Sequence, residues 1–317
     1  MKPPFKKGEI LPVRDGYGKA LIELGYANPR VIVLDADLAT STRSNWFAEQ
    51  FPQRFIDTGI AEQNMVGVAA GLSLKGKIPF VTTYGVFVTG RAFDQIRNTL
   101  CYSNLNVKIV GSHGGLSVGP DGGSHQAIED IALMNCLPNM KVFAPVDANE
   151  AWQVTLHAAK TTGPVYIRLA REATEIVTAG DYSFEPGKAK PLTRGEDGYI
   201  LFHSVIGCEV LKAQQILKSE GFNLTVLNFC SIKPLDTNML DEIAASGKPL
   251  FIVEEHLLNG GLTSIVATYY SLHKPVRLYS ISLNDCFGES GSPSELYDKY
   301  GFSAGKIAGC ISYNLGK

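Results

Sequence analysis

The sequence predicts an α/β protein built from two doubly wound domains. Over residues 1–180, short apolar runs rich in Val and Ile alternate with helical patterns. Such strands, separated by helices, indicate mostly parallel sheets that are covered on both faces. Residues 181–197 interrupt this pattern with prolines, glycines and charges, as linkers do. A second, shorter α/β series over residues 198–317 predicts a smaller domain.

The elements of the first domain follow from local patterns. A helix over 14–27 should end before Asn28-Pro29, and the capping box of residues 147–150 should open another helix, which reaches about residue 161. The expected strands are 31–34, 78–82, 107–110, 141–144 and 164–169. The remaining expected helices are the one opened by Glu62, which ends at 75–76, and those over 90–100 and 124–135. A glycine-rich loop is expected over 111–123.

The second domain should have the same plan. Its expected strands are 200–202, 225–227, 250–254 and 276–281, and its expected helices are 208–220 and 262–272. We expect right-handed crossovers in both sheets, as is the rule for parallel connections.

Composition excludes several classes of protein. The chain has 317 residues, a net charge of −2 and no basic block, which argues against nucleic acid binding. Its 6 cysteines lack metal-site spacing, and we expect small buried thiols in a reducing compartment. No apolar run is long enough to span a membrane, and the start of the sequence does not resemble a secretion signal. A soluble, cytoplasmic protein is the expectation.

The stretch from Arg54 to Leu72 is the most distinctive. Glu62 stands at the mouth of an apolar segment, Met65 to Leu72, which predicts a helix buried on all sides. Gly67 and Gly71 would give this helix a small-residue face. The Glu62 carboxyl either meets the helix dipole or serves in proton transfer, and the pattern alone leaves both interpretations open.

Polar residues also follow two predicted strands. His113, Asp121 and His125 lie among glycines in the loop after strand 107–110, where open α/β sheets bind ligands. They could bind a polar substrate, ligate a metal or be ordinary loop residues. Arg168 and Arg171 come at the end of strand 164–169, and they are either surface charges or ligands for phosphate or carboxylate.

Two aromatic residues follow strand 78–82. Tyr84 and Phe87 lie in a segment that leaves the same sheet as the His-containing loop. Aromatic residues after a strand are usually part of the core, but a flat ring of a ligand could stack on them here.

The segment Thr58-Gly-Ile-Ala-Glu62-Gln-Asn resembles the catalytic-glutamate segment of thiamine-diphosphate enzymes of the transketolase group. The likeness extends over most of the chain, and Ile232–Asp236 and Val253–His256 resemble the family's C-terminal domain. It implies a pyrimidine-binding (PYR) domain over 1–180, followed by a transketolase C-terminal domain over 198–317. Within this family, the chain resembles the C-terminal subunit of split transketolases.

The resemblance assigns roles to individual residues. Glu62 matches the glutamate that hydrogen-bonds the pyrimidine ring, Phe87 the phenylalanine that stacks on it, and Tyr84 a second aromatic that contacts the cofactor. The residues that match substrate contacts are His113, Asp121, His125, Arg171, Ser41 and Arg14. By this likeness the two histidines and Asp121 orient sugar hydroxyls and move protons, while the two arginines and Ser41 hold the phosphate.

One family segment is missing from the sequence. These enzymes anchor the diphosphate and its Mg²⁺ through a Gly-Asp-Gly segment, which this chain lacks. The resemblance therefore implies no metal ligands here and an N-terminal partner subunit that supplies them, in an α2β2 assembly. The implied reaction moves a two-carbon ketol unit from a ketose phosphate, such as xylulose 5-phosphate, to an aldose phosphate, such as ribose 5-phosphate.

Four alternatives remain open. The chain could be the β subunit of a 2-oxoacid dehydrogenase E1 component, which needs no sugar loop. It could be a synthase of the 1-deoxyxylulose-5-phosphate type, in which an arginine replaces His113. It could be a transketolase for an unusual pentulose phosphate. Finally, it could be a non-catalytic subunit that keeps the fold, although Glu62, Phe87 and His125 argue against this.

Overall fold

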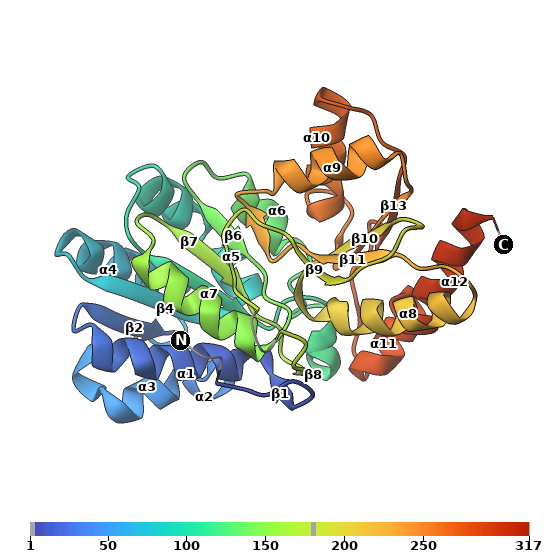
Figure 1. Cartoon of the computed structure of the whole chain (residues 1–317). Coiled ribbons are helices and arrows are strands. Elements are labelled where there is room, and N and C mark those ends of the chain that lie inside the picture. The colour runs from blue at the N-terminus through green and yellow to red at the C-terminus, as the bar shows by residue number, and fades with distance from the viewer. Residues whose placement is uncertain (1–3, 179–181, 317) are drawn as a thin grey trace.

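The computed structural model describes residues 4–178 and 182–316, and it has two α/β lobes side by side (Figure 1). The first lobe ends at residue 178 and is built on a large sheet. Its elements are β1 (Ile10–Pro12), α1 (Val13–Ala27), β2 (Val31–Asp35), α2 (Ala39–Thr42), α3 (Asn45–Gln50), η1 (Pro52–Arg54), β3 (Phe55–Asp57), α4 (Glu62–Leu74), β4 (Ile78–Tyr84), α5 (Gly85–Arg91), η2 (Gln95–Cys101), β5 (Lys108–Ser112), η3 (Leu116–Asp121), α6 (Asp130–Asn135), β6 (Lys141–Phe143), α7 (Ala148–Lys160), β7 (Val165–Arg168) and β8 (Ala173–Glu175).

The large sheet has the strand order β12-β6-β7-β5-β4-β2-β3, and the strands from β6 to β3 are parallel. Helices α1, α3 and α7 cover one face, and α4, η2 and α6 pack on the other. Strands β2, β4, β5 and β7 are buried along their whole length, because both faces are covered. The predicted doubly wound plan is confirmed.

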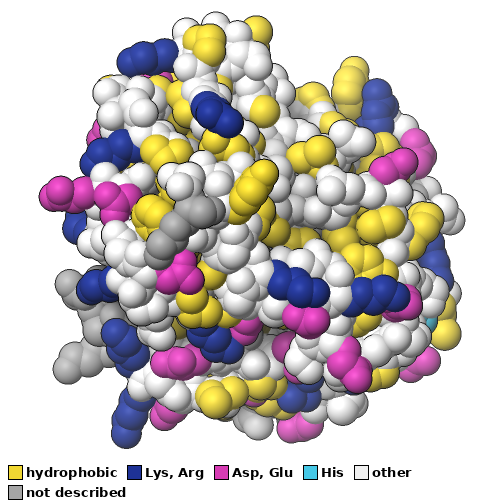
Figure 2. Space-filling model, turned by 90° about the vertical axis from the view of Figure 1, so that its right-hand side faces the viewer, with side chains coloured by type: hydrophobic (Ala, Val, Ile, Leu, Met, Phe, Trp, Pro, Cys, Tyr) yellow, Lys and Arg dark blue, Asp and Glu magenta, His cyan; other side chains and the backbone are white. Residues whose placement is uncertain are grey.

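The second lobe repeats this plan on a smaller sheet, in the order β14-β13-β10-β11-β9, with only β9 antiparallel. Its elements are β9 (Lys190–Thr193), β10 (Tyr199–Phe202), η4 (Ser204–Ile206), α8 (Gly207–Ser219), β11 (Thr225–Asn228), β12 (Ser231–Lys233), α9 (Thr237–Ser246), β13 (Leu250–Leu257), α10 (Leu262–Leu272), β14 (Leu278–Leu283), α11 (Pro293–Tyr300) and α12 (Ala304–Leu315). On the face of the molecule shown in Figure 2, basic and acidic side chains are interspersed.

The two lobes are joined by more than the connecting chain. Strand β12 belongs to the second half of the sequence, yet it pairs antiparallel with β6 of the large sheet. The segment 181–197, expected to be a linker, contains β9, an edge strand paired with β11. Pro191 is compatible with that edge position, where one side of the strand makes no ladder bonds. The proposed boundary between residues 180 and 181 lies outside the described residues.

Two predicted helices differ from the structure. The helix expected over 90–100 is divided into α5, which starts at Gly85, and η2. The helix expected over 124–135 begins only at Asp130. The backbone just before Asp130 forms hydrogen bonds with other segments instead of a helix. The Ala127 carbonyl accepts from Gly115 N, and the Ile128 carbonyl accepts from Leu257 N.

Two expectations about burial were also wrong. Cys136, Cys286 and Cys310 are exposed, in contrast to the buried thiols expected, whereas Cys101 and Cys230 are buried. Helix α4 is not buried on all sides either. Its exposed face carries Gln63, Asn64, Gly67, Gly71 and Leu74.

Among the helices of residues 4–178 and 182–316, none is long and apolar enough to cross a membrane.

The contact between α1 and α7 gives a test of the packing. A Cβ on Gly16 would lie 1.9 Å from the carbonyl oxygen of Ala148, so Gly16→Ala should force the helices apart. We expect the free energy of unfolding to fall by roughly 1–3 kcal/mol, the usual cost of overpacking. Gly309→Ala in α12 is the control, because nothing lies within 4 Å of its Cβ. That variant should be about 0.5–1 kcal/mol more stable. Equal changes in the free energy of unfolding of the two variants, measured by denaturant titration, would contradict the close packing at Gly16.

Candidate active site

The predicted site residues converge on one edge of the large sheet. Five neighbouring strands, β7, β5, β4, β2 and β3, present their carboxyl ends there. The site residues at or after these strand ends are, in the same order, Arg171, His113, Tyr84 with Phe87, Ser41, and Glu62. Arg14 joins them from the start of α1. This is the edge at which open α/β sheets bind ligands.

Glu62 opens α4 directly after Ala61 and is 4% exposed. Its Oε1 atom accepts a hydrogen bond and ion pair from Arg91 Nη1 at 2.8 Å. The guanidinium of Arg91 lies over the ring of Phe87, with Cζ 4.0 Å from the ring centroid. The Glu62 carboxyl and the face of the Phe87 ring therefore both contact the guanidinium of Arg91. Sequence reasoning missed Arg91, although its position four residues after Phe87 in a helix would have placed it beside that ring.

Four rings form a group that includes Phe87, the ring covered by Arg91. Tyr84 stacks on His113 with centroids 3.8 Å apart, and on Phe87 with centroids 5.7 Å apart. His125 meets Phe87 edge-on at 5.3 Å. The structure thus brings together the two aromatics and the two histidines that the sequence placed in separate loops.

His113 is held in an unusual environment. Its φ of 62° is in the left-handed region, which non-glycine residues rarely adopt, and it is 3% exposed. Its Nδ1 atom lies 2.9 Å from Ser112 Oγ. Burial, followed by the nearby charges of Arg14 and Arg171, lowers the pKa of His113 to about 3. The imidazole is therefore neutral and a weak base around neutral pH, with one ring nitrogen that donates a hydrogen bond and one that accepts.

The two arginines border the same loop. Arg171 Nη1 donates to the Val118 carbonyl at 2.7 Å and lies 3.6 Å from the Asp121 carboxylate. Arg14 Nη1 donates to the Arg171 carbonyl. Within the described part of the chain, the Nε atom of Arg14 is buried without a hydrogen-bond partner. Burial and the charge of Arg43 lower the pKa of Arg14. Positive charge with a free donor is suited to binding an anion.

Ser41 lies half-buried in the short helix α2. Buried Asp35 holds the start of this segment, accepting hydrogen bonds from Leu38 N, Thr42 Oγ1 and Ser44 Oγ. In the hydrogen bonds of the described chain, Ser41 has no link to the other predicted site residues. Its assignment to the phosphate site stays a prediction.

Arg168 is not a surface charge. It is fully buried and pairs with Asp130 at 3.1 Å. Burial alone would lower its pKa, but the charges of Asp130 and Glu255 outweigh this and raise it. Over residues 4–178 and 182–316, no group of three His, Cys, Asp or Glu side chains is placed to share a metal ion.

The comparisons with known proteins agree with the two-domain fold. Residues 10–176 match the family described as the pyrimidine binding domain of transketolase, and residues 187–307 match the transketolase C-terminal domain. A putative transketolase C-terminal section of Methanocaldococcus jannaschii is 43% identical, with 96% of each chain covered. The structure of a split-gene transketolase, described as an inactive β4 tetramer, is 44% identical, with a TM-score of 0.87 and coverage of 96% of this chain and 98% of that one.

The chain belongs to the transketolase family. It corresponds to the C-terminal half, since it spans about half of the human transketolase, to which it is 36% identical over 98% of its own length. It also matches a 6-deoxy-6-sulfo-D-fructose transketolase subunit of Clostridium sp. strain MSTE9, at 36% identity, with 97% of this chain and 96% of the other covered.

The family implies thiamine diphosphate, and the residues present fit one end of it. The Glu62 carboxylate and the Phe87 face together hold the guanidinium of Arg91, which is planar and donates hydrogen bonds. An aminopyrimidine is also planar and has a hydrogen-bond donor at its edge, so the same pair of contacts suits it. For the diphosphate end, the part of the chain that the structure describes offers no metal-ligand cluster.

The lowered pKa of His113 predicts a pH dependence of stability. The unfolded chain takes up this proton near pH 6.5 and the folded chain only near pH 3. Between these values the unfolded state binds more protons, so stability falls as the pH is lowered. From pH 7 to pH 5 the loss should be about 2 kcal/mol. His113→Gln should lack this part of the loss in denaturant titrations at the two pH values. An unchanged pH dependence would contradict the assigned environment.

Proposed function

We propose that this chain is the pyrimidine- and sugar-binding subunit of a split transketolase, active only with an N-terminal partner. The observation that carries the proposal is the meeting of Glu62, Phe87, His113 and His125 with two arginines at one sheet edge. The β subunit of a 2-oxoacid dehydrogenase does not need the loop that carries the two histidines and Asp121. In this chain the Asp121 carboxylate lies 3.6 Å from the Arg171 guanidinium.

Each residue would have a task at a defined place. Glu62 would hold a proton at the cofactor's pyrimidine edge, while Phe87 and Tyr84 stack beside it. His113 and His125 would orient the sugar hydroxyls and move protons, helped by Asp121. Arg171, Arg14 and Ser41 would bind the phosphate and so fix the reacting carbonyl by remote binding energy. Thiamine diphosphate, when bound, supplies the carbanion-stabilising chemistry of ketol transfer.

The partner would complete the site. It would carry the diphosphate-binding segment and most of the Mg²⁺ ligands, in an α2β2 assembly. The exposed face of α4 supports this, because nothing lies within 4 Å of a Cβ on Gly67 or Gly71, and Ile60 and Leu74 beside it are 75% and 72% exposed. A second backbone could approach closely there, next to Glu62. The split-gene relative described as an inactive β4 tetramer supports both self-association and inactivity of the isolated subunit.

The substrate pair is proposed as xylulose 5-phosphate and ribose 5-phosphate, or another pentulose phosphate. A second candidate is a ketose sulfonate, because one relative is named a sulfofructose transketolase subunit. Arg14 and Arg171 suit either anion. Relative kcat/KM values for xylulose 5-phosphate and 6-deoxy-6-sulfofructose as donors would decide between the two.

Glu62→Gln tests the proton-transfer role. Glutamine can still accept from Arg91, so the fold should be kept, but it cannot shuttle a proton. We expect turnover of the assembled enzyme to fall by at least ~100-fold, the scale of a removed acid–base group. A variant with near wild-type turnover would refute the role.

The dependence on a partner is tested by reconstitution. The chain is purified alone and given thiamine diphosphate, Mg²⁺ and a ketose-phosphate/aldose-phosphate pair, with or without a partner that carries the Gly-Asp-Gly segment. We expect transfer only with the partner, because a cofactor anchored at one end should bind weakly. Full transfer by the chain alone would refute the split site. Decarboxylation of a 2-oxoacid instead of transfer would favour the dehydrogenase alternative.

A further inference from the structure

The segment 113–125, here called the sugar loop, has an irregular backbone that needs outside support. His113, Gly115, Gly119 and Gly122 all have φ between 62° and 87°. Three backbone bonds tie its ends: Gly114 N to Leu169 O at 2.9 Å, Gly115 N to Ala127 O at 2.8 Å, and His125 N to Gly122 O at 2.9 Å. Residues 116–118 lie between these ties and are fully or almost fully buried.

The middle of the sugar loop is held by a carboxylate from the second lobe. Glu255 on β13 is fully buried, and its Oε2 accepts from the backbone N–H of Ser117 at 3.1 Å. Its Oε1 lies 3.3 Å from Ser117 Oγ, which donates to it. One carboxylate therefore satisfies both donors of a single loop residue that lies between the two histidines.

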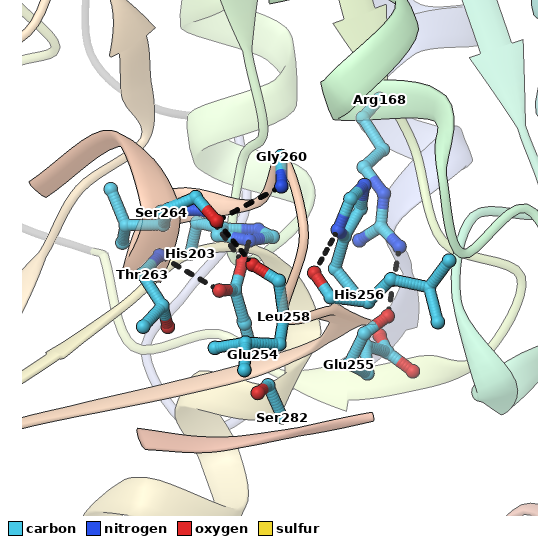
Figure 3. Close-up of polar contacts among 12 residues, drawn as sticks. Arg168, His203, Glu254, Glu255, His256, Leu258, Gly260, Thr263, Ser264 and Ser282 are labelled. Atoms are coloured by element: carbon cyan, nitrogen blue, oxygen red, sulfur yellow. Dashed lines mark hydrogen bonds and ion pairs between the residues drawn. The ribbon is translucent and has the colours of Figure 1, made fainter. Parts of the chain in front are cut away.

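The carboxylate fits closely against the loop. A Cβ on Gly115 would lie 2.3 Å from Glu255 Cδ, so Glu255 occupies the space that a side chain there would need. The Glu255 carbonyl accepts from Arg168 Nη2 at 3.3 Å, which anchors the strand to the first lobe (Figure 3). Arg168 thus holds the backbone of Glu255, while the Glu255 side chain points to the loop.

Other parts of the second lobe complete the support. Gln126 Nε2 donates to the Glu289 carbonyl at 3.0 Å and to Leu116 O at 3.3 Å. A Cβ on Gly288 would lie 2.0 Å from Gln126 Oε1, and a Cβ on Gly122 would lie 2.5 Å from Ser290 Oγ. The segment 288–290 therefore packs along the end of the loop that carries His125.

We propose that Glu255 is the positioning residue through which the second lobe fixes the sugar loop in the conformation that presents His113, Asp121 and His125. The sugar-binding part rests on the proposed function. The positioning part concerns this chain alone, so the two can be tested separately. Glu255 contacts no substrate itself and acts through Ser117.

The neighbouring residue provides a matched control. Glu254 precedes Glu255 in β13 and is equally buried, but its side chain points away from the sugar loop (Figure 3). Its carboxylate accepts from Leu262 N and Thr263 N at the start of α10, at 2.7 and 2.8 Å, and lies 3.2 Å from His203 Nε2. Removing it therefore disturbs the second lobe without touching the sugar loop.

The first experiment measures amide hydrogen exchange in the isolated chain. Glu255→Ala removes the acceptor of the buried Ser117 backbone N–H, and we expect exchange over residues 114–118 to accelerate roughly 10-fold or more. Glu255→Gln, which keeps an acceptor for Ser117 N, should restore most of the protection. Glu254→Ala should accelerate exchange at the start of α10 and leave 114–118 unchanged. Unchanged exchange in Glu255→Ala, or equal loop exchange in both alanine variants, would overturn the proposal.

The second experiment uses the complex reconstituted with the partner. Glu255→Ala should raise the KM for both sugar phosphates by roughly 10-fold. Thiamine diphosphate affinity, measured by titration, should stay within about 2-fold, because Glu62 and Phe87 are not supported by Glu255. A parallel loss of cofactor affinity would overturn the positioning role. Absence of transfer by the wild-type complex would instead refute the proposed function, and the exchange result would still decide the positioning.

A second variant covers the case in which Glu255→Ala does not fold. Gly288→Ala changes no charge, but its Cβ would displace Gln126 and Leu116, whose Cδ2 would be 2.6 Å away. The same rise in KM and the same local exchange are expected at the His125 end of the loop. Wild-type values for both in Gly288→Ala would overturn the part of the proposal in which the second lobe supports the His125 end of the loop.

Discussion

The buried guanidinium of Arg168 is the contact on which the geometry of the site depends. It pairs with Asp130, at the start of α6, and donates to the carbonyls of Ala127 and Glu255. It therefore joins the end of β7, the exit of the sugar loop and the strand β13 of the second lobe; Figure 3 shows its contact with Glu255 on β13. A buried ion pair of this kind adds little net stability, but removing one partner leaves an uncompensated charge and costs roughly 3–5 kcal/mol. Its main effect is to fix three segments in one arrangement.

The fold was predictable because its strands are continuous apolar runs, a pattern that only a doubly covered sheet explains. The predictions of helix bounds and strand pairing were wrong where backbone hydrogen bonds connect segments that are not neighbours in the sequence. Ala127 and Ile128 have helical sequence neighbours, but their carbonyls bond to Gly115 and Leu257, so the helix starts later. Strand β12 joins the other lobe's sheet, a pairing with a partner about 90 residues away along the chain that no local pattern contains.

The position of the candidate site was predictable where a residue's type and its place after a strand suggest a role, as for Glu62, His113 and Phe87; the roles themselves stay predictions. Arg91 and Glu255 could not be assigned in this way, because their partners are distant in sequence. Arg91 reaches Glu62 across 29 residues and Glu255 reaches Ser117 across 138. Arg168 and Arg171 have the same sequence context, yet one is buried and the other lies beside Asp121. Burial, which separates their roles, is a property of the folded chain.

The proposed anion-binding residues, Arg14 and Arg171, affect the proton affinity of His113, which is one of the proposed proton-transfer residues. After burial, the charges of Arg14 and Arg171 are the next largest causes that lower the pKa of His113. A phosphate or sulfonate bound by these two arginines would offset their charges, and the affinity of the imidazole for a proton would rise. A substrate that lacks the anion would leave both charges uncompensated and His113 a weak base. If the two arginines bind the anion and His113 faces the sugar, as proposed, the anion would raise the proton affinity of the imidazole as well as contribute to binding.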